Sequence, residues 1–122
     1  MFGKIASCML FAATLLATSR ATADYAAIAY AKSTGSYGYS YGYHSRAEAE
    51  TEALSRCRGS DKKVVVWVHN GWCALALSHG RTYGYGFSTQ CRQSAKDRAL
   101  RECAARAGCA HIAVSVFSGY DR

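Results

Sequence analysis

The chain has 122 residues, of which half are hydrophobic, and 15 basic residues against 8 acidic ones give it a net charge of +7. This length suits one domain with a small core, and the absence of proline leaves no obvious linker that would divide it. A basic protein favours anionic partners, but no run of basic residues indicates that it binds nucleic acid.

The first 23 residues have the pattern of a signal peptide. A short positive start ending at Lys4 precedes an apolar stretch over residues 5–17, and residues 21–23 offer small side chains to a signal peptidase. The apolar stretch is shorter than the ~20 residues of a stable membrane span. We therefore expect cleavage before Asp24, release into the periplasm or outside the cell, and a mature single domain over residues 24–122 without a membrane span.

The mature chain contains similar passages at about residues 24–69 and 72–118, each predicted as strand, strand, helix and strand. Ser45 and Glu48 form a capping box at the start of the first helix, and Gly59 and Gly108 are placed to end the two helices. Asn70 and Gly71 are a strong hairpin signal between the passages. The expected elements are strands over 26–31, 37–43, 64–69, 72–78, 83–87 and 110–117, with helices over 46–58 and 91–107.

These elements predict an α+β fold with two ββαβ repeats, a mainly antiparallel sheet and two alanine-rich helices. Because the Asn70-Gly71 turn joins the repeats directly, we expect one sheet shared by both. Five strings occur along the chain in a characteristic order: Ala27-Ile28-Ala29-Tyr30, residues 45–50, Ala53-Leu54 followed by Cys57, Asn70-Gly71, and Cys73-Ala74-Leu75-Ala76. In this order they resemble the DUF4189 family of small exported bacterial proteins.

The family resemblance implies export and this fold, and it supplies neither a substrate nor catalytic residues. The chain departs from the family pattern at Lys62 and Lys63, where a cysteine is expected, so the resemblance assigns no partner to Cys57.

The mature chain has an odd number of cysteines, so we expect a disulfide-stabilised domain with one thiol left over. Cys103 and Cys109 flank the end of the second helix, where Gly108 reverses the chain, and they are the first predicted pair. Cys57 and Cys73 are the second, which predicts a free thiol at Cys91. Pairing of Cys91 with Cys73 is the alternative.

Tyrosine alternates with glycine or serine along two predicted strands, so the rings share one face of each strand. In the favoured interpretation, the rings pack as core over the alanine-rich helices. In the other, glycine and serine face the helices and the rings form a binding surface. The candidate ligand-binding residues are Tyr37, Tyr39, Tyr41, Tyr43, Tyr83 and Tyr85, with Phe87 extending the second row.

No catalytic or metal-binding pattern stands out. The four histidines, at positions 44, 69, 79 and 111, lack the spacing of a metal motif, and no Gly-x-Ser-x-Gly string marks a hydrolase. The acidic cluster at residues 48, 50 and 52 suits the start of a helix. Arg98, Arg101 and Arg106 are basic residues of the second helix that serve solubility or an acidic partner. We predict neither a catalytic site, a metal nor a cofactor.

The predicted function is therefore that of an exported, non-enzymatic binding module with a protein partner in the envelope or outside the cell. In its specific form the module is a periplasmic inhibitor or immunity-type protein acting on a secreted hydrolase or toxin. The alternatives are an envelope-glycan binder that uses the aromatic rows, and a small secreted enzyme with Cys91 or a histidine as its reactive group.

Overall fold

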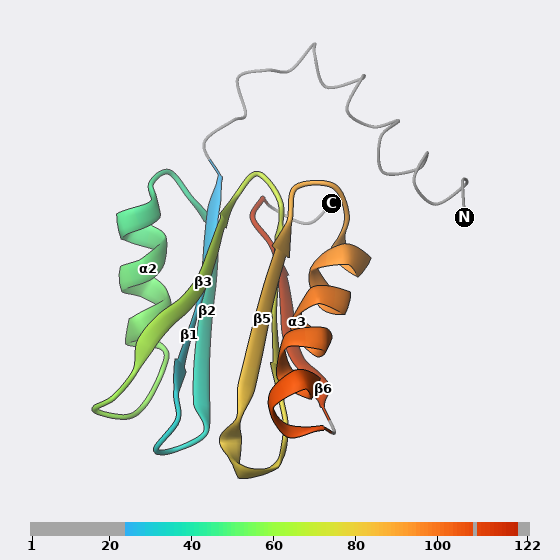
Figure 1. Ribbon diagram of the computed structural model, residues 1–122. Coiled ribbons are helices and arrows are strands. Elements are labelled where there is room, and N and C mark those ends of the chain that lie inside the picture. Colours follow the sequence, from blue (N-terminus) through green and yellow to red (C-terminus); the bar gives the residue numbers. More distant parts are fainter. Residues whose placement is uncertain (1–23, 109, 120–122) are drawn as a thin grey trace, which may run out of the picture.

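The computed structural model describes residues 24–108 and 110–119, so the predicted signal peptide lies outside the described residues. The elements follow the predicted order in both halves of the chain (Figure 1). They are β1 (Tyr25–Ala31), β2 (Ser36–Tyr43), α2 (Arg46–Ser55), β3 (Lys63–His69), β4 (Trp72–Leu77), the 3-10 turn η2 (His79–Arg81), β5 (Tyr83–Ser88), α3 (Arg92–Ala107) and β6 (His111–Phe117).

The strands form two antiparallel sheets of three strands each, in the orders β2-β1-β3 and β5-β4-β6. The α+β class is confirmed, but the prediction of one shared sheet is wrong. The turn at Asn70 and Gly71 does not pair β3 with β4; it carries the chain from one sheet to the other. Its backbone groups bond elsewhere, since Asn70 N–H donates to Asp24 O at 2.9 Å and Gly71 O accepts from Ser118 N–H at 2.8 Å.

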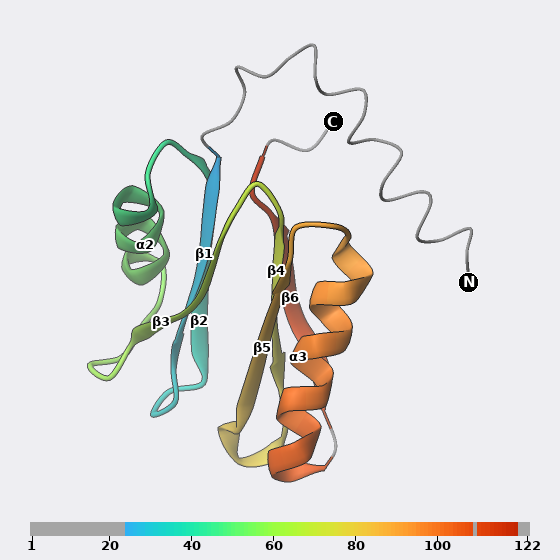
Figure 2. The same ribbon diagram turned by 45° about the horizontal axis from the view of Figure 1, so that its top comes forward.

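The two sheets lie face to face, with α2 outside the first and α3 outside the second, so the molecule has four layers (Figures 1 and 2). The central strands β1 and β4 are covered on both faces. In β1, Ile28 and Tyr30 point between the sheets, whereas Ala27 and Ala29 point toward α2. This double burial explains why β1 has no charged residue and an almost uniformly apolar sequence.

Each helix lies close to its sheet because small residues meet at the contact. Ala49 and Ala53 of α2 are fully buried, as are Ala95 and Ala99 of α3. On the sheet side, a Cβ atom added to Gly86 would lie 2.6 Å from the carbonyl oxygen of Ala95, nearer than real Cβ atoms come. Backbone therefore packs almost directly on backbone between α3 and β5.

The helix termini agree with the sequence signals except at one end. The Ser45 hydroxyl accepts a hydrogen bond from Glu48 N–H at 3.1 Å, which confirms the predicted N-cap. Gly108, with φ 91°, ends α3 as predicted. The first helix ends at Ser55 instead of about residue 58, and Gly59 (φ 135°) lies in the following loop, where a Cβ atom would lie 2.7 Å from that of Ala31.

Candidate functional site

Three of the four tyrosines of β2 face away from the helices. Gly38 faces α2, since a Cβ atom there would lie 2.5 Å from Ala53 O. Tyr37, Tyr39 and Tyr41 alternate with the helix-facing residues and are 37%, 38% and 45% exposed. The interpretation of these rings as core over the helices is therefore wrong, because the helix side of β2 leaves no room for a large side chain.

Tyr43 does not belong to this row. The pairing of β1 with β2 shifts between Tyr25 and Ala27, and Gly42 there has a positive φ of 79°. Such an irregularity displaces the strand by one residue and reverses the faces beyond it. Tyr43 accordingly packs with the alanine cluster between α2 and the first sheet. The prediction that it shares a face with Tyr41 is wrong for this reason.

The second aromatic row lies on β5, with Gly84 and Gly86 toward α3. Tyr85 and Phe87 are 41% and 47% exposed, while Tyr83 is half-buried with its ring centroid 5.2 Å from that of Tyr30. β2 lies against β6, and β5 lies against β3. The two rows therefore occupy opposite edges of the sandwich.

Tyr37 is held by a hydrogen bond to the other sheet. Its hydroxyl donates to Ala113 O at 3.3 Å, and Ala113 lies where the pairing of β4 with β6 shifts between Leu75 and Ala76. A bulge leaves backbone groups outside the ladder, so Tyr37 supplies a partner for one of them. The first row is thereby fixed against β6.

A third aromatic group, which the sequence analysis did not identify, lies beside the start of α2. The rings of Tyr25 and His69 stack at 4.2 Å with an interplanar angle of 8°, and Trp67 lies 6.3 Å from Tyr25. The Arg46 guanidinium lies 4.3 Å from the Trp67 ring centroid and bonds Glu50 at 2.8 Å. The alternation of Trp67 and His69 along their strand was the available signal, but the place of Tyr25 depends on strand register.

The cysteines are placed differently from the prediction. Cys57 belongs to the layer between α2 and the first sheet, whereas Cys73 points between the two sheets. The predicted Cys57–Cys73 disulfide is therefore wrong, and no disulfide joins Cys57, Cys73 or Cys103 to another described cysteine. Cys109 lies outside the described residues, so the Cys103–Cys109 pair stays a prediction.

The buried thiols have structural surroundings. Cys57 Sγ donates to Ser36 O at 3.4 Å, at the first residue of β2, and Cys103 Sγ donates to Thr82 O at 3.6 Å, immediately before β5. Burial raises the pKa of the Cys73 thiol to about 12. A thiol with such a pKa is inert at neutral pH.

Cys91 is half-buried at the N-cap of α3, with its Sγ atom 3.5 Å from Ser94 Oγ. Among the described residues, no three His, Cys, Asp or Glu side chains converge as a metal site requires.

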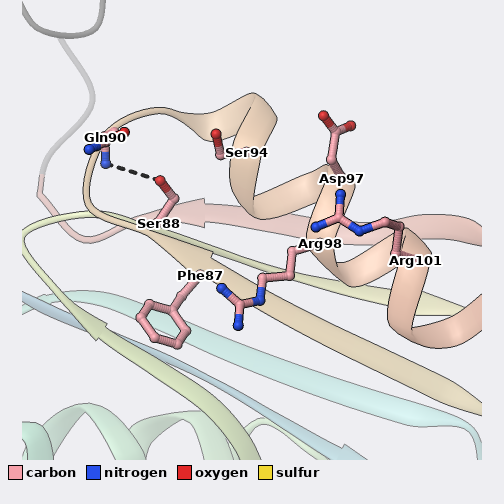
Figure 3. A pocket seen from close by; sticks show the side chains of 7 residues that line it. All are labelled: Phe87, Ser88, Gln90, Ser94, Asp97, Arg98 and Arg101. Atoms are coloured by element: carbon pink, nitrogen blue, oxygen red, sulfur yellow. Dashed lines mark hydrogen bonds between the residues drawn. The ribbon is translucent and has the colours of Figure 1, made fainter. Parts of the chain in front are cut away.

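A hollow of about 310 Å³ lies on the surface between the end of β5 and α3 (Figure 3). Another, of about 390 Å³, lies over α2 and is lined by Tyr43, Ala47, Glu48, Thr51 and Glu52. The first is lined by Phe87, Ser88, Gln90, Ser94, Asp97, Arg98 and Arg101.

The fold and these surfaces define a small α+β domain of two helix-covered sheets with exposed aromatic edges. A family profile described as "Domain of unknown function (DUF4189)" matches residues 25–116. The chain therefore belongs to the DUF4189 family, as the sequence resemblance indicated. Comparisons with curated proteins and with solved structures gave no significant match. No helix of the described residues has the length and apolar character needed to cross a membrane.

Proposed function

We propose that this protein is an exported, non-enzymatic binding module whose partner is another protein in the envelope or outside the cell. The observation that carries this proposal is the set of large aromatic side chains left in solvent on a small domain. They are Tyr37, Tyr39, Tyr41, Trp67, Tyr85 and Phe87, all at least 37% exposed.

The chemistry of these side chains suits protein recognition. Tyrosine, tryptophan and arginine are the residues that most often dominate the free energy of binding at interfaces. Here several are held by their own contacts, since Tyr37 bonds Ala113 and Arg46 lies over Trp67. A side chain already fixed in place loses little entropy when a partner binds.

The specific form of the proposal is a periplasmic inhibitor or immunity-type protein that blocks a secreted hydrolase or toxin. After removal of Lys4 and Arg20 with the predicted signal peptide, the net charge is +5. A basic domain with rigid aromatic edges is complementary to an acidic enzyme cleft, since opposite potentials speed encounter and fix orientation.

Capture of a partner tests this proposal. Mature protein tagged at its C-terminus is incubated with envelope extract and with culture supernatant, and bound proteins are identified by mass spectrometry. We expect one hydrolase or toxin at near-equal stoichiometry, with loss of capture for Tyr39→Ser or Tyr41→Ser. Lys62→Gln, which removes an exposed charge and leaves every aromatic ring in place, is the matched control. Recovery of no protein, or equal recovery by the tyrosine variants, would contradict the proposal.

A glycan-binding protein of the envelope is the second candidate, and the two open aromatic rows favour it. Retention on peptidoglycan or another envelope polysaccharide, lost when Tyr39 or Tyr85 is replaced by serine, would support it. The small-enzyme alternative requires a turnover that Cys91→Ser abolishes.

We further propose that the domain arose by internal duplication and that a Cys103–Cys109 disulfide reinforces it. The two sheets have the same strand order relative to the chain. The pairing of the central strand with the last strand of each half also shifts register at corresponding places. The shift lies between Ile28 and Ala29 of β1 in one half and between Leu75 and Ala76 of β4 in the other.

A further inference from the structure

The hollow between β5 and α3 gathers side chains from two sources. Phe87 and Ser88 end β5, and Ser94, Arg98 and Arg101 extend from α3 (Figure 3). Residues three or four apart share one face of a helix, so Ser94, Arg98 and Arg101 form one wall of the hollow, and Phe87 lines it from the face of β5 turned away from α3. The volume of about 310 Å³ suits one small ring-shaped group.

The hollow carries two guanidinium groups, and neither forms an ion pair with Asp97, the carboxylate that also lines it. Arg98 lies with its guanidinium carbon 5.8 Å from the centroid of Phe87. Within the described residues, neither Arg98 nor Arg101 forms an ion pair, although Arg46, Arg56 and Arg106 each pair with a glutamate four residues away. Two guanidiniums on adjacent turns are therefore available to an anionic ligand. A planar guanidinium can donate two parallel hydrogen bonds to the two oxygens of a carboxylate.

The other lining groups suit a ligand that carries hydroxyls. The Ser88 hydroxyl oxygen accepts from the backbone N–H groups of Gln90 and Cys91, at 3.0 Å and 3.3 Å, which leaves its own proton to donate. Asp97 accepts from the Gln93 amide at 2.9 Å and retains further acceptor sites. The Asp97 carboxylate repels any anionic group placed against it, so it suits the hydroxyls of a ligand, whereas an anionic group of that ligand belongs at the two arginines.

We propose that this hollow binds a sugar that carries a carboxylate, such as the uronic-acid unit of an anionic polysaccharide. The exposed Phe87 ring provides an apolar surface for one face of the sugar ring. Arg98 and Arg101 bind the carboxylate, while Ser88, Ser94 and Asp97 bind hydroxyls. This inference rests on the glycan candidate and gives it a definite site, independent of the β2 row.

The first half of the chain offers an internal control, because the position that corresponds to Arg98 carries the opposite charge. Gly38 faces Ala53 O as Gly84 faces Ala99 O, which aligns the two helices. By this alignment Arg98 corresponds to Glu52, and Glu52 lies in an ion pair with Arg56 at 2.7 Å. The equivalent surface on α2 therefore lacks the free guanidiniums, and we expect no anionic sugar to bind there.

Titration with trigalacturonate, followed by amide chemical shifts in NMR spectra, tests the proposal. We expect saturable shifts of amides in residues 87–101, and none with maltotriose, which lacks the carboxylates. Arg98→Gln and Arg101→Gln should each weaken binding about tenfold or more, since each removes charge-assisted hydrogen bonds. Phe87→Ala should weaken it as well, and Glu52→Gln should leave it unchanged. The amide spectrum of each variant reports in the same experiment whether the fold is intact.

Several outcomes would overturn the inference. Acetate or inorganic phosphate binding as tightly as trigalacturonate would show an anion site without sugar recognition. Arg98→Lys binding as well as the parent would show that charge alone suffices. No shift with trigalacturonate, together with loss of a captured protein in Arg98→Gln, would make the hollow a protein-docking site. Failure of the sugar titration leaves the partner-capture result with Tyr39→Ser unaffected, so the two proposals fail separately.

Discussion

A Cβ atom added to Gly84 would lie 2.6 Å from the carbonyl oxygen of Ala99 and would also meet the backbone nitrogen of Cys103. Because both contacts are with helix backbone, a methyl group can be accommodated only by moving α3 away from β5. We expect Gly84→Ala to lower the free energy of unfolding by about 1–3 kcal/mol, the usual cost of overpacking. Urea denaturation followed by tryptophan fluorescence measures this loss.

Ser40 provides the control for that variant in the other half of the molecule. Its buried hydroxyl donates to Ala49 O at 2.6 Å, so a Cβ atom is already accommodated between β2 and α2. Ser40→Ala removes only the hydrogen bond, and we expect a loss of about 1 kcal/mol. A Gly84→Ala protein as stable as the parent would contradict the close approach of α3.

The exposed tyrosines on β2 differ from the buried tyrosine on β1 in how much they should contribute to stability. Tyr39 is 38% exposed, whereas Tyr30 is 2% exposed and donates its hydroxyl to Arg81 O at 2.9 Å. We expect Tyr39→Ser to cost about 1 kcal/mol of stability and Tyr30→Ser about 3 kcal/mol or more. Thermal unfolding followed by circular dichroism gives both values. Equal losses would mean that the Tyr39 ring belongs to the core. The β2 row could then not serve as a binding surface for a partner.

Most helices and strands could be predicted from the sequence because the signals that begin and end them lie in neighbouring residues. The Ser45 cap, the Gly108 end and the alternation of the strands all act within a few residues. The prediction of one shared sheet was wrong because the Asn70-Gly71 signal describes a turn and does not determine whether the strands on either side of it pair. The apolar strings at residues 26–31 and 73–77 are typical of strands buried on both faces, and they were the available sign of four layers.

The candidate site could be predicted only in part for a related reason. Alternation placed Tyr37, Tyr39 and Tyr41 on one face, but it could not show that the irregularity at Gly42 turns Tyr43 to the other. The hollow beside Arg98 depends on the packing of α3 against the end of β5. Contacts between distant segments of this kind are not encoded in any short string.

The turn after β1 is tied to the loop after α2 through Asp61, and this contact predicts a pH dependence. The carboxylate accepts from the Ser33 hydroxyl at 2.6 Å and from the Ser33 backbone N–H at 2.9 Å. These hydrogen bonds hold the pKa of Asp61 below its ordinary value. A lowered folded pKa stabilises the fold fully above the unfolded pKa of about 3.9, and the contribution is lost as pH falls through the folded value.

We therefore expect Asp61→Asn to lower the melting temperature at pH 7 and to differ less from the parent below about pH 4. Ser33→Ala should show the same pH dependence, because it removes the hydroxyl partner of the same carboxylate. Melting temperatures measured from pH 3 to pH 7 test both variants. A difference between Asp61→Asn and the parent that stays constant over this range would contradict the linkage.

The thiol of Cys73 lies between the two sheets, so its reactivity reports whether the core is closed to solvent. With a pKa of about 12 and no exposed surface, the thiol should not react with iodoacetamide at pH 8 while the protein is folded. After unfolding in guanidinium chloride it should react fully. Peptide mapping by mass spectrometry, with alkylation before and after unfolding, measures the modification of each cysteine separately.

The same peptide map tests the remaining disulfide prediction, because a Cys103–Cys109 bridge would keep both residues unmodified in unfolded protein until a reductant is added. Cys73 needs unfolding alone, whereas the bridged pair needs unfolding and reduction, so burial and covalent pairing give different patterns. Rapid modification of Cys73 in the folded protein would contradict the face-to-face packing of the two sheets. Modification of Cys103 and Cys109 in unfolded, unreduced protein would remove the disulfide and leave the hydrogen bond from Cys103 to Thr82 as the role of that thiol.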